Sequence, residues 1–224
     1  MTETITPQQF HKAADIEDWR VLTNVAHAHF LTGSFAEGVT FVDAIGSLAE
    51  AANHHPDIDL RPDGVTVRLT TTTPKPQLEQ DFFWLSERDV DLARRISATA
   101  RDLGVRSDPT ALQSVQVTID VLVHADLMPF WRAVLGYRQV GNEDLLDPQS
   151  QGPPIWFQQM DAPRPQRNRI HIDIWVPHDQ AEARIAAVID AGGHLVNDRY
   201  APAWWTLADA EGNEIDVATW MGRD

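Results

Sequence analysis

The chain contains no cysteine among its 224 residues. This absence excludes disulfide bonds, thiolate nucleophiles and cysteine-ligated metals, and it leaves histidine and carboxylate side chains as the strong metal ligands. The sequence also has no apolar run that approaches the roughly 20 residues needed to span a bilayer. Its first residues include neither a basic segment nor an apolar one, so we expect no secretory signal, no membrane partner and a cytoplasmic protein.

Positive charge is scarce as well. There are 18 Lys and Arg residues against 33 Asp and Glu residues, which gives a formal net charge of -15. Nucleic acids and anionic membranes are bound by concentrated Lys/Arg surfaces, and the sequence shows no such cluster, so we expect no nucleic-acid partner. The length is comfortable for two domains, each with a core of its own.

The most informative segment reads Glu50-x-x-x-His54-His55-Pro56. An imidazole has an unperturbed pKa of about 6.5, so both of its protonation states are available near neutral pH. Pro56 favours an extended conformation for the residue before it, which would place both histidines at a corner between a helix and a strand. The pattern indicates acid/base chemistry by His54 and His55, with Glu50 one helical turn away to orient an imidazole. The alternative is a surface turn with two solvated histidines.

The first half of the chain predicts a small antiparallel sheet with helices on one side. Phe41, Ile45 and Leu48 recur every three or four residues and predict a helix over 35–52. Further elements follow from alternation, turn residues and caps. They are a short helix over 7–14, strands over 27–31, 58–61 and 65–71, and a helix that begins after Ser86 and ends at Gly104.

Four motifs in order resemble the pterin-4a-carbinolamine dehydratase family over the first half of the chain. They are the aromatic residues Phe30, Phe35 and Phe41, the Glu50-x-x-x-His54-His55-Pro56 signature, the strand Val65-x-Val67-x-Leu69-Thr70-Thr71, and the helix start Leu85-Ser86-Glu87-Arg88-Asp89. The resemblance implies a dehydratase that acts on a pterin without a cofactor, and we expect a homo-oligomer. It implies His54, His55 and Glu50 as catalytic residues. It implies substrate contacts from Pro56, Thr71, Thr72 and Asp89, although Asp89 could equally cap its helix.

One position departs from the family pattern. The family carries a third histidine directly after the Leu-x-Thr strand, and here that position is Thr72. A hydroxyl can form hydrogen bonds but has no pKa near 7, so it cannot replace an imidazole as acid or base. We therefore expect weakened turnover, with His27 or His29 as candidates for the empty place because both point to one face of their strand.

The second half contains an internal repeat. The strand segment 116–123 aligns with 169–176, and each is followed by a helix, over about 126–135 and 179–191, and by further strands. Two βαβββ units in tandem result, and the whole chain is predicted to be an α+β protein. The polar break at 106–110 predicts a first domain over 1–106, a linker over 107–113 and a second domain over 114–224.

The duplicated unit resembles the glyoxalase and extradiol-dioxygenase superfamily, also called vicinal oxygen chelate. In that superfamily a histidine on the first strand and a glutamate on the last strand of each unit hold a metal in a cup. The matching positions are His171 and Asp216 in the second unit. In the first unit they are Thr118 and either Gln158 or Gln159. Since Thr and Gln are weak ligands, we expect no divalent metal, and metal-dependent chemistry stays the alternative.

Two functions from different classes follow. In the first, the N-terminal domain eliminates water from a 4a-hydroxytetrahydropterin by histidine-based acid/base catalysis. In the second, that domain is a non-catalytic pterin-binding or dimerising module, and the glyoxalase-like domain binds a small organic ligand or performs metal-dependent chemistry.

Overall fold

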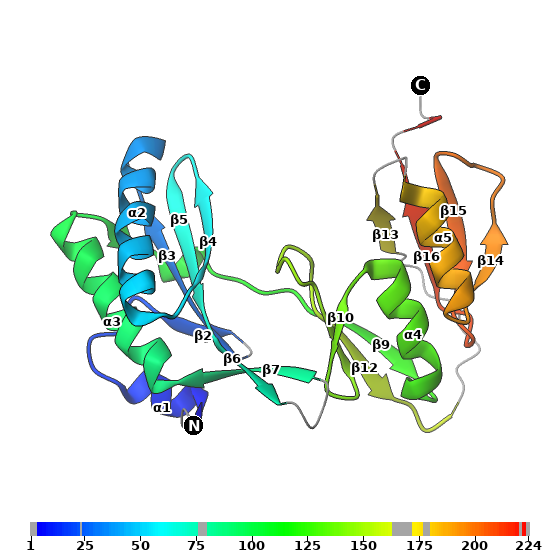
Figure 1. Ribbon diagram of the computed structural model, residues 1–224, viewed down its shortest axis with the longest axis horizontal. Helices are drawn as coiled ribbons and strands as arrows, with labels where there is room; N and C mark the ends of the chain where they lie inside the picture. Colours follow the sequence, from blue (N-terminus) through cyan, green and yellow to red (C-terminus); the bar gives the residue numbers. More distant parts are fainter. Residues whose placement is uncertain are drawn as a thin grey trace. The chain divides into compact units, whose positions relative to one another are not determined.

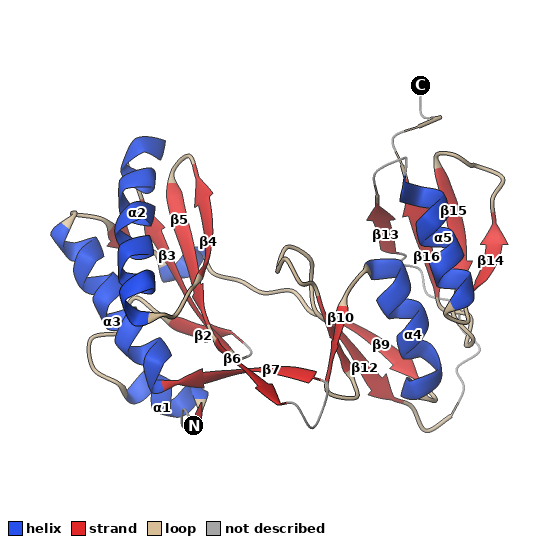
Figure 2. Cartoon of the chain, viewed as in Figure 1, coloured by secondary structure: helices blue, strands red, loops and turns tan. Residues whose placement is uncertain are grey.

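The computed structural model describes residues 4–22, 24–75, 80–162, 172–176, 180–219 and 221–222. It is an α+β structure, as predicted, with antiparallel sheets in the first half, mixed sheets in the second and helices in both (Figures 1 and 2). Its contacts divide the chain into two compact units, Met1–Ser114 and Val115–Asp224. None of the described helices combines the length and the apolar character that crossing a bilayer requires.

In its described residues the first unit contains three α-helices and two sheets. The helices are α1 (Pro7–Lys12), α2 (Phe35–Ala52) and α3 (Glu87–Asp102). The main sheet has the order β2-β3-β5-β4, and a short strand, β8, pairs with β3. Its strands are β2 (Arg20–Leu22), β3 (Val25–Leu31), β4 (Asp57–Arg61), β5 (Gly64–Leu69) and β8 (Arg106–Ser107).

The core of this unit lies between the main sheet and the helices. Along β3, Ala26, Ala28 and Phe30 are buried while the residues between them are half-buried, which is the alternation expected of a strand with one covered face. Phe30 packs edge-on against Phe41 of α2, with ring centroids 5.0 Å apart. It also packs edge-on against Trp19, at 6.5 Å. The predicted apolar stripe of α2 is thus the face that covers the sheet.

A second, three-stranded sheet has the order β1-β7-β6. Its strands are β1 (Thr4–Ile5), β6 (Thr71–Lys75) and β7 (Gln80–Ser86). The sequence predicted one strand over 65–71, whereas the structure ends β5 at Leu69 and starts β6 at Thr71. It did not predict the β6–β7 hairpin at all, because Thr-Thr-Thr-Pro lacks the apolar alternation that marks a half-buried strand. The predicted third-histidine position, Thr72, therefore lies on this hairpin.

The segment predicted as a linker, 107–113, lies partly against the first unit. Ser107 belongs to β8 and pairs with Phe30, and the backbone N–H of Asp108 donates to the His29 carbonyl at 2.8 Å. A short 3-10 helix, η1 (Pro109–Ala111), follows and also contacts β3. The division of the chain falls after Ser114.

The second unit is built from two βαβββ modules, as the repeat predicted. The first module contains β9 (Val117–Val121), α4 (His124–Leu135), β10 (Arg138–Val140), β11 (Asp144–Leu146) and β12 (Ile155–Gln159). The second contains β13 (Ile172–Trp175), α5 (Ala181–Asp190), β14 (His194–Asn197), β15 (Trp204–Ala208) and β16 (Glu214–Ala218). In each module the first and last strands pair in parallel.

Two side chains from the β15–β16 turn tie the modules together. The Asp209 carboxylate accepts the indole N–H of the buried Trp131 on α4 at 3.0 Å. The Glu211 carboxylate accepts the backbone N–H groups of Leu122 and Val123, at 2.9 and 3.1 Å, at the start of α4. A carboxylate at a helix N-terminus is stabilised by the unpaired N–H groups and by the helix dipole. Residues from both modules accordingly share one hydrophobic core.

Candidate functional site: a buried histidine–aspartate pair

The C-terminus of α2 fixes the backbone from which both histidines emerge. Asn53 adopts a left-handed conformation, with φ 46° and ψ 42°. Its N–H donates to the Glu50 carbonyl, and the N–H of His54 donates to the Ala49 carbonyl at 3.0 Å. These two bonds form a Schellman motif, which asparagine tolerates better than most residues other than glycine. The helix therefore ends at Asn53, before Pro56 is reached.

Arg88 of α3 reinforces this helix end. Its guanidinium donates to the carbonyl of Asn53 and, at 3.4 Å, to that of Ala52. A cation at the C-terminus of a helix satisfies free carbonyls and interacts favourably with the helix dipole. The contact joins α3 to the C-terminal end of α2, directly before His54.

His54 points into the unit and pairs with Asp89. Its side chain is only 7% exposed, and its Nε2 lies 2.8 Å from Oδ1 of the fully buried Asp89. Because an ionised carboxylate can only accept, Nε2 carries the proton in this contact. The described residues give Nδ1 no hydrogen-bond partner. In its neutral form His54 therefore keeps a lone pair on Nδ1, which can accept a proton from a ligand.

The second oxygen of Asp89 is held by three further groups. Oδ2 accepts the backbone N–H of Ser86 at 2.7 Å, and it lies 2.7 Å from the hydroxyl of Thr71 and 2.9 Å from that of Ser86. The two hydroxyls also lie 2.6 Å apart, so one of them can donate to the other instead. Asp89 is thus both the cap of α3 and the residue that orients His54. The capping role that the sequence offered for Asp89 is present, and the substrate contact implied for it stays a prediction.

His55 points in a different direction. Its side chain is 57% exposed, and its Nε2 lies 3.0 Å from Oε1 of Glu50, which is 80% exposed. The predicted partnership of Glu50 with an imidazole thus concerns His55, while His54 is served by Asp89. Solvent weakens such an exposed pair, so the contact orients His55 more than it stabilises the unit.

The other predicted substrate contacts are Pro56, Thr71 and Thr72. Pro56 is half-buried between His55 and the first residue of β4. Thr71 is buried and joins the Asp89 network, as described. The backbone of Thr72 pairs with Phe83 in the hairpin, and its side chain lies outside the described part of the structure.

His27 and His29, the candidates for the empty third place, face away from the core. Nδ1 of His27 bonds to the Val25 carbonyl at 3.0 Å, and Nδ1 of His29 bonds to the Thr66 hydroxyl at 2.9 Å. The structure brings neither ring to His54 or His55 within the described residues. Sequence reasoning missed the roles of Ser86 and Arg88 in this site, although Ser86 was recognised as a helix cap.

The cup positions of the second unit do not form a metal site among the residues described. No three His, Asp or Glu side chains come together there in a group that could hold a metal ion. Asp216 is half-buried on β16, opposite Asp173 of β13 and Thr206 of β15, and His171 lies outside the described residues. Since β12 pairs Gln158 with Asp120, and Asp120 is the repeat equivalent of Asp173, Gln158 is the residue that corresponds to Asp216.

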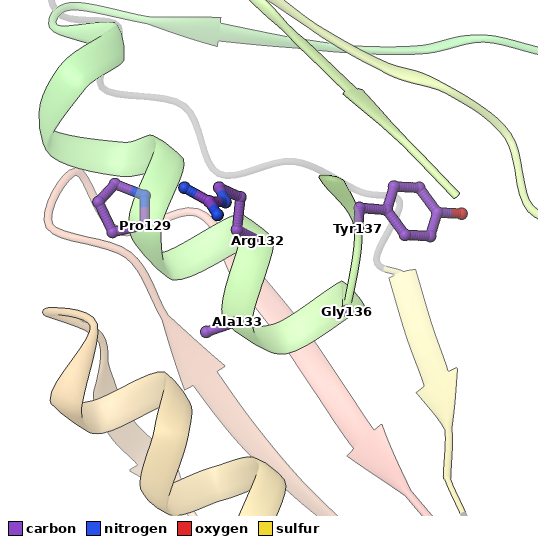
Figure 3. A pocket seen from close by; sticks show the side chains of 5 residues that line it. All are labelled: Pro129, Arg132, Ala133, Gly136 and Tyr137. Atoms are coloured by element: carbon purple, nitrogen blue, oxygen red, sulfur yellow. The ribbon is translucent and has the colours of Figure 1, made fainter. Parts of the chain in front are cut away.

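A depression of about 410 Å³ lies at the end of α4, outside both predicted sites. Figure 3 shows Pro129 and Arg132 along the helix and Tyr137 beyond its end. Burial raises the pKa of the Tyr137 hydroxyl, and the nearby Asp147 carboxylate adds to this effect. The hollow is therefore a surface feature of mixed character, without the paired imidazoles of the first unit.

The first unit is thus an α+β unit in which a buried histidine–carboxylate pair sits beside an exposed histidine. Comparison with known proteins identifies the family. The family model "Pterin 4 alpha carbinolamine dehydratase" matches residues 3–99, and "Glyoxalase-like domain" matches residues 116–218. The chain belongs to the pterin-4a-carbinolamine dehydratase family through its first unit and contains a glyoxalase-like domain as its second.

Individual relatives of the first unit agree with the dehydratase family assignment. Two of them are named "Putative pterin-4-alpha-carbinolamine dehydratase". The protein from Roseiflexus sp. strain RS-1 is 38% identical over 38% of this chain and 83% of its own length. That from Nocardia farcinica is 35% identical over 45% of this chain and 98% of its own. A glyoxalase/bleomycin resistance protein/dioxygenase family enzyme from Burkholderia phytofirmans PsJN is 16% identical, covers 46% of this chain and 95% of its own, and has a TM-score of 0.40.

Proposed function

We propose that the first unit is a 4a-hydroxytetrahydropterin dehydratase in which His54 and His55 transfer the protons. The observation that carries the proposal is the pair of His54 and Asp89, buried and held at 2.8 Å. A histidine fixed in this way presents one nitrogen in a defined protonation state and direction. The names of the relatives support a pterin as the substrate.

The proposed reaction removes one water molecule. Nδ1 of His54 takes the proton from N5 of the pterin, and the electron pair of that N–H bond forms the C4a–N5 double bond. The bond from C4a to the hydroxyl breaks, and His55, in its protonated form, gives a proton to the departing oxygen. The products are quinonoid dihydropterin and water. Proton exchange between His54, His55 and solvent restores the starting state.

Each residue contributes through a contact already described. Asp89 holds the proton on Nε2 and stabilises the positive charge that develops on His54. Glu50 does the same for His55, more weakly because that pair is exposed. With Thr72 in place of a third imidazole, we expect a turnover rate above the spontaneous reaction but below that of a three-histidine dehydratase.

A stopped-flow assay on enzymatically generated carbinolamine tests this proposal. We expect His54→Ala to lower kcat/KM by about 100-fold or more, the usual scale for a lost acid or base. His194→Ala, which removes an exposed imidazole from β14 in the second unit, should leave the rate unchanged. A wild-type rate equal to the spontaneous background would refute the dehydratase proposal.

Two conservative variants separate the effect of Asp89 on His54 from its effect on the stability of the unit. Asp89→Asn removes the charge beside His54, and we expect a fall in kcat together with a shifted pH profile. Thr71→Val removes only a hydroxyl from Oδ2, so it should cost some stability and leave the shape of the pH profile intact. Equal pH profiles for both variants would show that Asp89 acts only as a cap.

The second candidate is a non-catalytic pterin-binding or dimerising module, and the exposure of His55 and Glu50 is the observation that favours it. Isothermal titration with reduced pterins and with Mn(II), Fe(II) and Zn(II) distinguishes the candidates. Binding of pterin without turnover supports the module. Binding of a metal would assign chemistry to the glyoxalase-like domain.

A further inference from the structure

The main sheet of the first unit has a second face that the dehydratase proposal does not use. The residues of β3 that alternate with the core residues point to it, and so do Thr66 and Arg68 of β5. The register places Arg20, His27 and Arg68 side by side on β2, β3 and β5. We call these three residues the open-face row.

Arg68 is the unusual member of the row. It lies on β5, which is paired with a strand on both sides, and its side chain is half-buried. Its Nε is buried without a hydrogen-bond partner, and its guanidinium forms no ion pair with any described residue. Asp57 is its direct neighbour on β4, and the two described side chains form no ion pair. An arginine stays charged in proteins, so a partly desolvated guanidinium without an anion is costly.

His27, next to Arg68, complements it. Nδ1 lies 3.0 Å from the Val25 carbonyl and therefore donates, which leaves Nε2 as an acceptor when the ring is neutral. Burial lowers the pKa of His27, the hydrogen bond to Val25 raises it, and the charge of Arg68 lowers it. The ring is thus neutral at pH 7. An acceptor beside a guanidinium matches a group that carries both a negative oxygen and a hydroxyl.

Arg20 ends the row. Its Nη1 donates to the carbonyls of Glu17 and Trp19, both at 2.7 Å, which fixes the side chain at the edge of the sheet. A depression of about 250 Å³ adjoins it, lined in part by Arg20 and Glu17. Neither His27 nor Arg68 lines this depression, so it borders only the Arg20 end of the row.

We propose that the open-face row binds the phosphate group of a small molecule in its singly protonated form. Two phosphate oxygens accept hydrogen bonds from the Arg68 guanidinium, and the phosphate hydroxyl donates one to Nε2 of His27. Two parallel N–H···O bonds are the preferred geometry between guanidinium and phosphate. A carboxylate fits less well, because it offers no hydroxyl to His27. The carboxylate of Asp57 opposes binding, while that of Asp59 is already paired with Arg61 at 3.0 Å.

Titration of the full chain with inorganic phosphate at constant ionic strength, followed by amide NMR shifts, tests the proposal. We expect saturable shifts at His27, Thr66 and Arg68. Arg68→Gln should weaken binding by about tenfold or more. Arg95→Gln removes the same charge from an exposed position on α3 and should leave the dissociation constant within about twofold, as is usual for surface charges.

Further variants and ligands test the phosphate proposal more closely. Asp57→Asn should tighten phosphate binding, because it removes the opposing charge. Methyl phosphate in place of inorganic phosphate tells a phosphorylated metabolite from the free ion, and acetate should bind more weakly than either. If Arg68→Gln does not fold, Arg68→Lys keeps the charge without the two-pronged contact and should still weaken binding.

Absence of saturable shifts, or equal weakening by Arg68→Gln and Arg95→Gln, would overturn the phosphate proposal. The dehydratase proposal is tested by turnover at His54 and does not depend on this titration. A chain that binds phosphate but does not turn over carbinolamine, or the reverse, therefore identifies which of the two is wrong.

Discussion

At the scale of single residues, the two adjacent histidines have opposite environments. His54 is buried against Asp89, and His55 is exposed beside Glu50. The sequence predicted that the pair lies at a helix-to-strand corner, and it does. It could not predict which carboxylate serves which ring, because Glu50 is near both in the chain, whereas Asp89 reaches His54 from 35 residues away.

His27 allows a prediction about pH at the same scale. Its pKa is lower in the folded state than in the unfolded state, so protonation favours unfolding. The contribution of His27 to stability is therefore complete above about pH 6.5, the unfolded pKa, and is lost as the pH falls toward the folded pKa. His27→Gln should reduce the difference in stability between pH 7 and pH 5.

Native-state hydrogen exchange of the β3 and β5 amides measures this difference in both proteins. The opening free energy of the wild type should fall as the pH is lowered from 7 to 5, and that of His27→Gln should fall less, because the variant has no imidazole to protonate. An unchanged pH dependence would mean that His27 has the same pKa in the folded and unfolded states.

At the scale of elements, helix ends and apolar stripes were predictable, and the hairpin was not. The helix predicted over 35–52 is α2, because its stripe and its Ser34 cap are local features. The strand predicted over 65–71 instead divides near Thr70, whose hydroxyl bonds to the Trp84 carbonyl at 3.2 Å. That contact depends on a partner strand 14 residues further along the chain, and no local sequence pattern predicts this pairing.

Substitution of Asn53 tests the role of the left-handed residue that ends α2. Its left-handed backbone ends α2 and sets the direction of His54, so Asn53→Ala should destabilise the first unit by about 1 kcal/mol. Asn53→Gly adopts the same conformation without strain and serves as the control. Chemical unfolding followed at the α2 amides would check both, and equal loss in the two variants would contradict the role assigned to the left-handed cap.

At the scale of the whole molecule, the two units have separate hydrophobic cores. Phe30→Ala should therefore lower the stability of the first unit by about 3–5 kcal/mol, the usual cost of truncating a buried aromatic side chain. Hydrogen exchange in β9 and β12 of the second unit should not change. Parallel loss of protection in both units would instead show that they unfold together.

The duplication in the second unit was visible in the sequence because both copies keep the same alternation. The sequence did not identify the ligand of this unit, because Gln158 on β12 and Asp216 on β16 are polar residues that can serve many roles. Register supplied what sequence could not, by selecting Gln158 over Gln159 as the counterpart of Asp216.

Asp89 performs two tasks with one carboxylate: it closes the first turn of α3 and it steers His54. Natural selection for a folded chain alone would retain it, even in a lineage that had abandoned pterin chemistry. Retention of this aspartate in a relative would therefore be weak evidence for catalysis. The exposed His55 could be lost at almost no cost to the fold, so its retention would be the better indicator of activity.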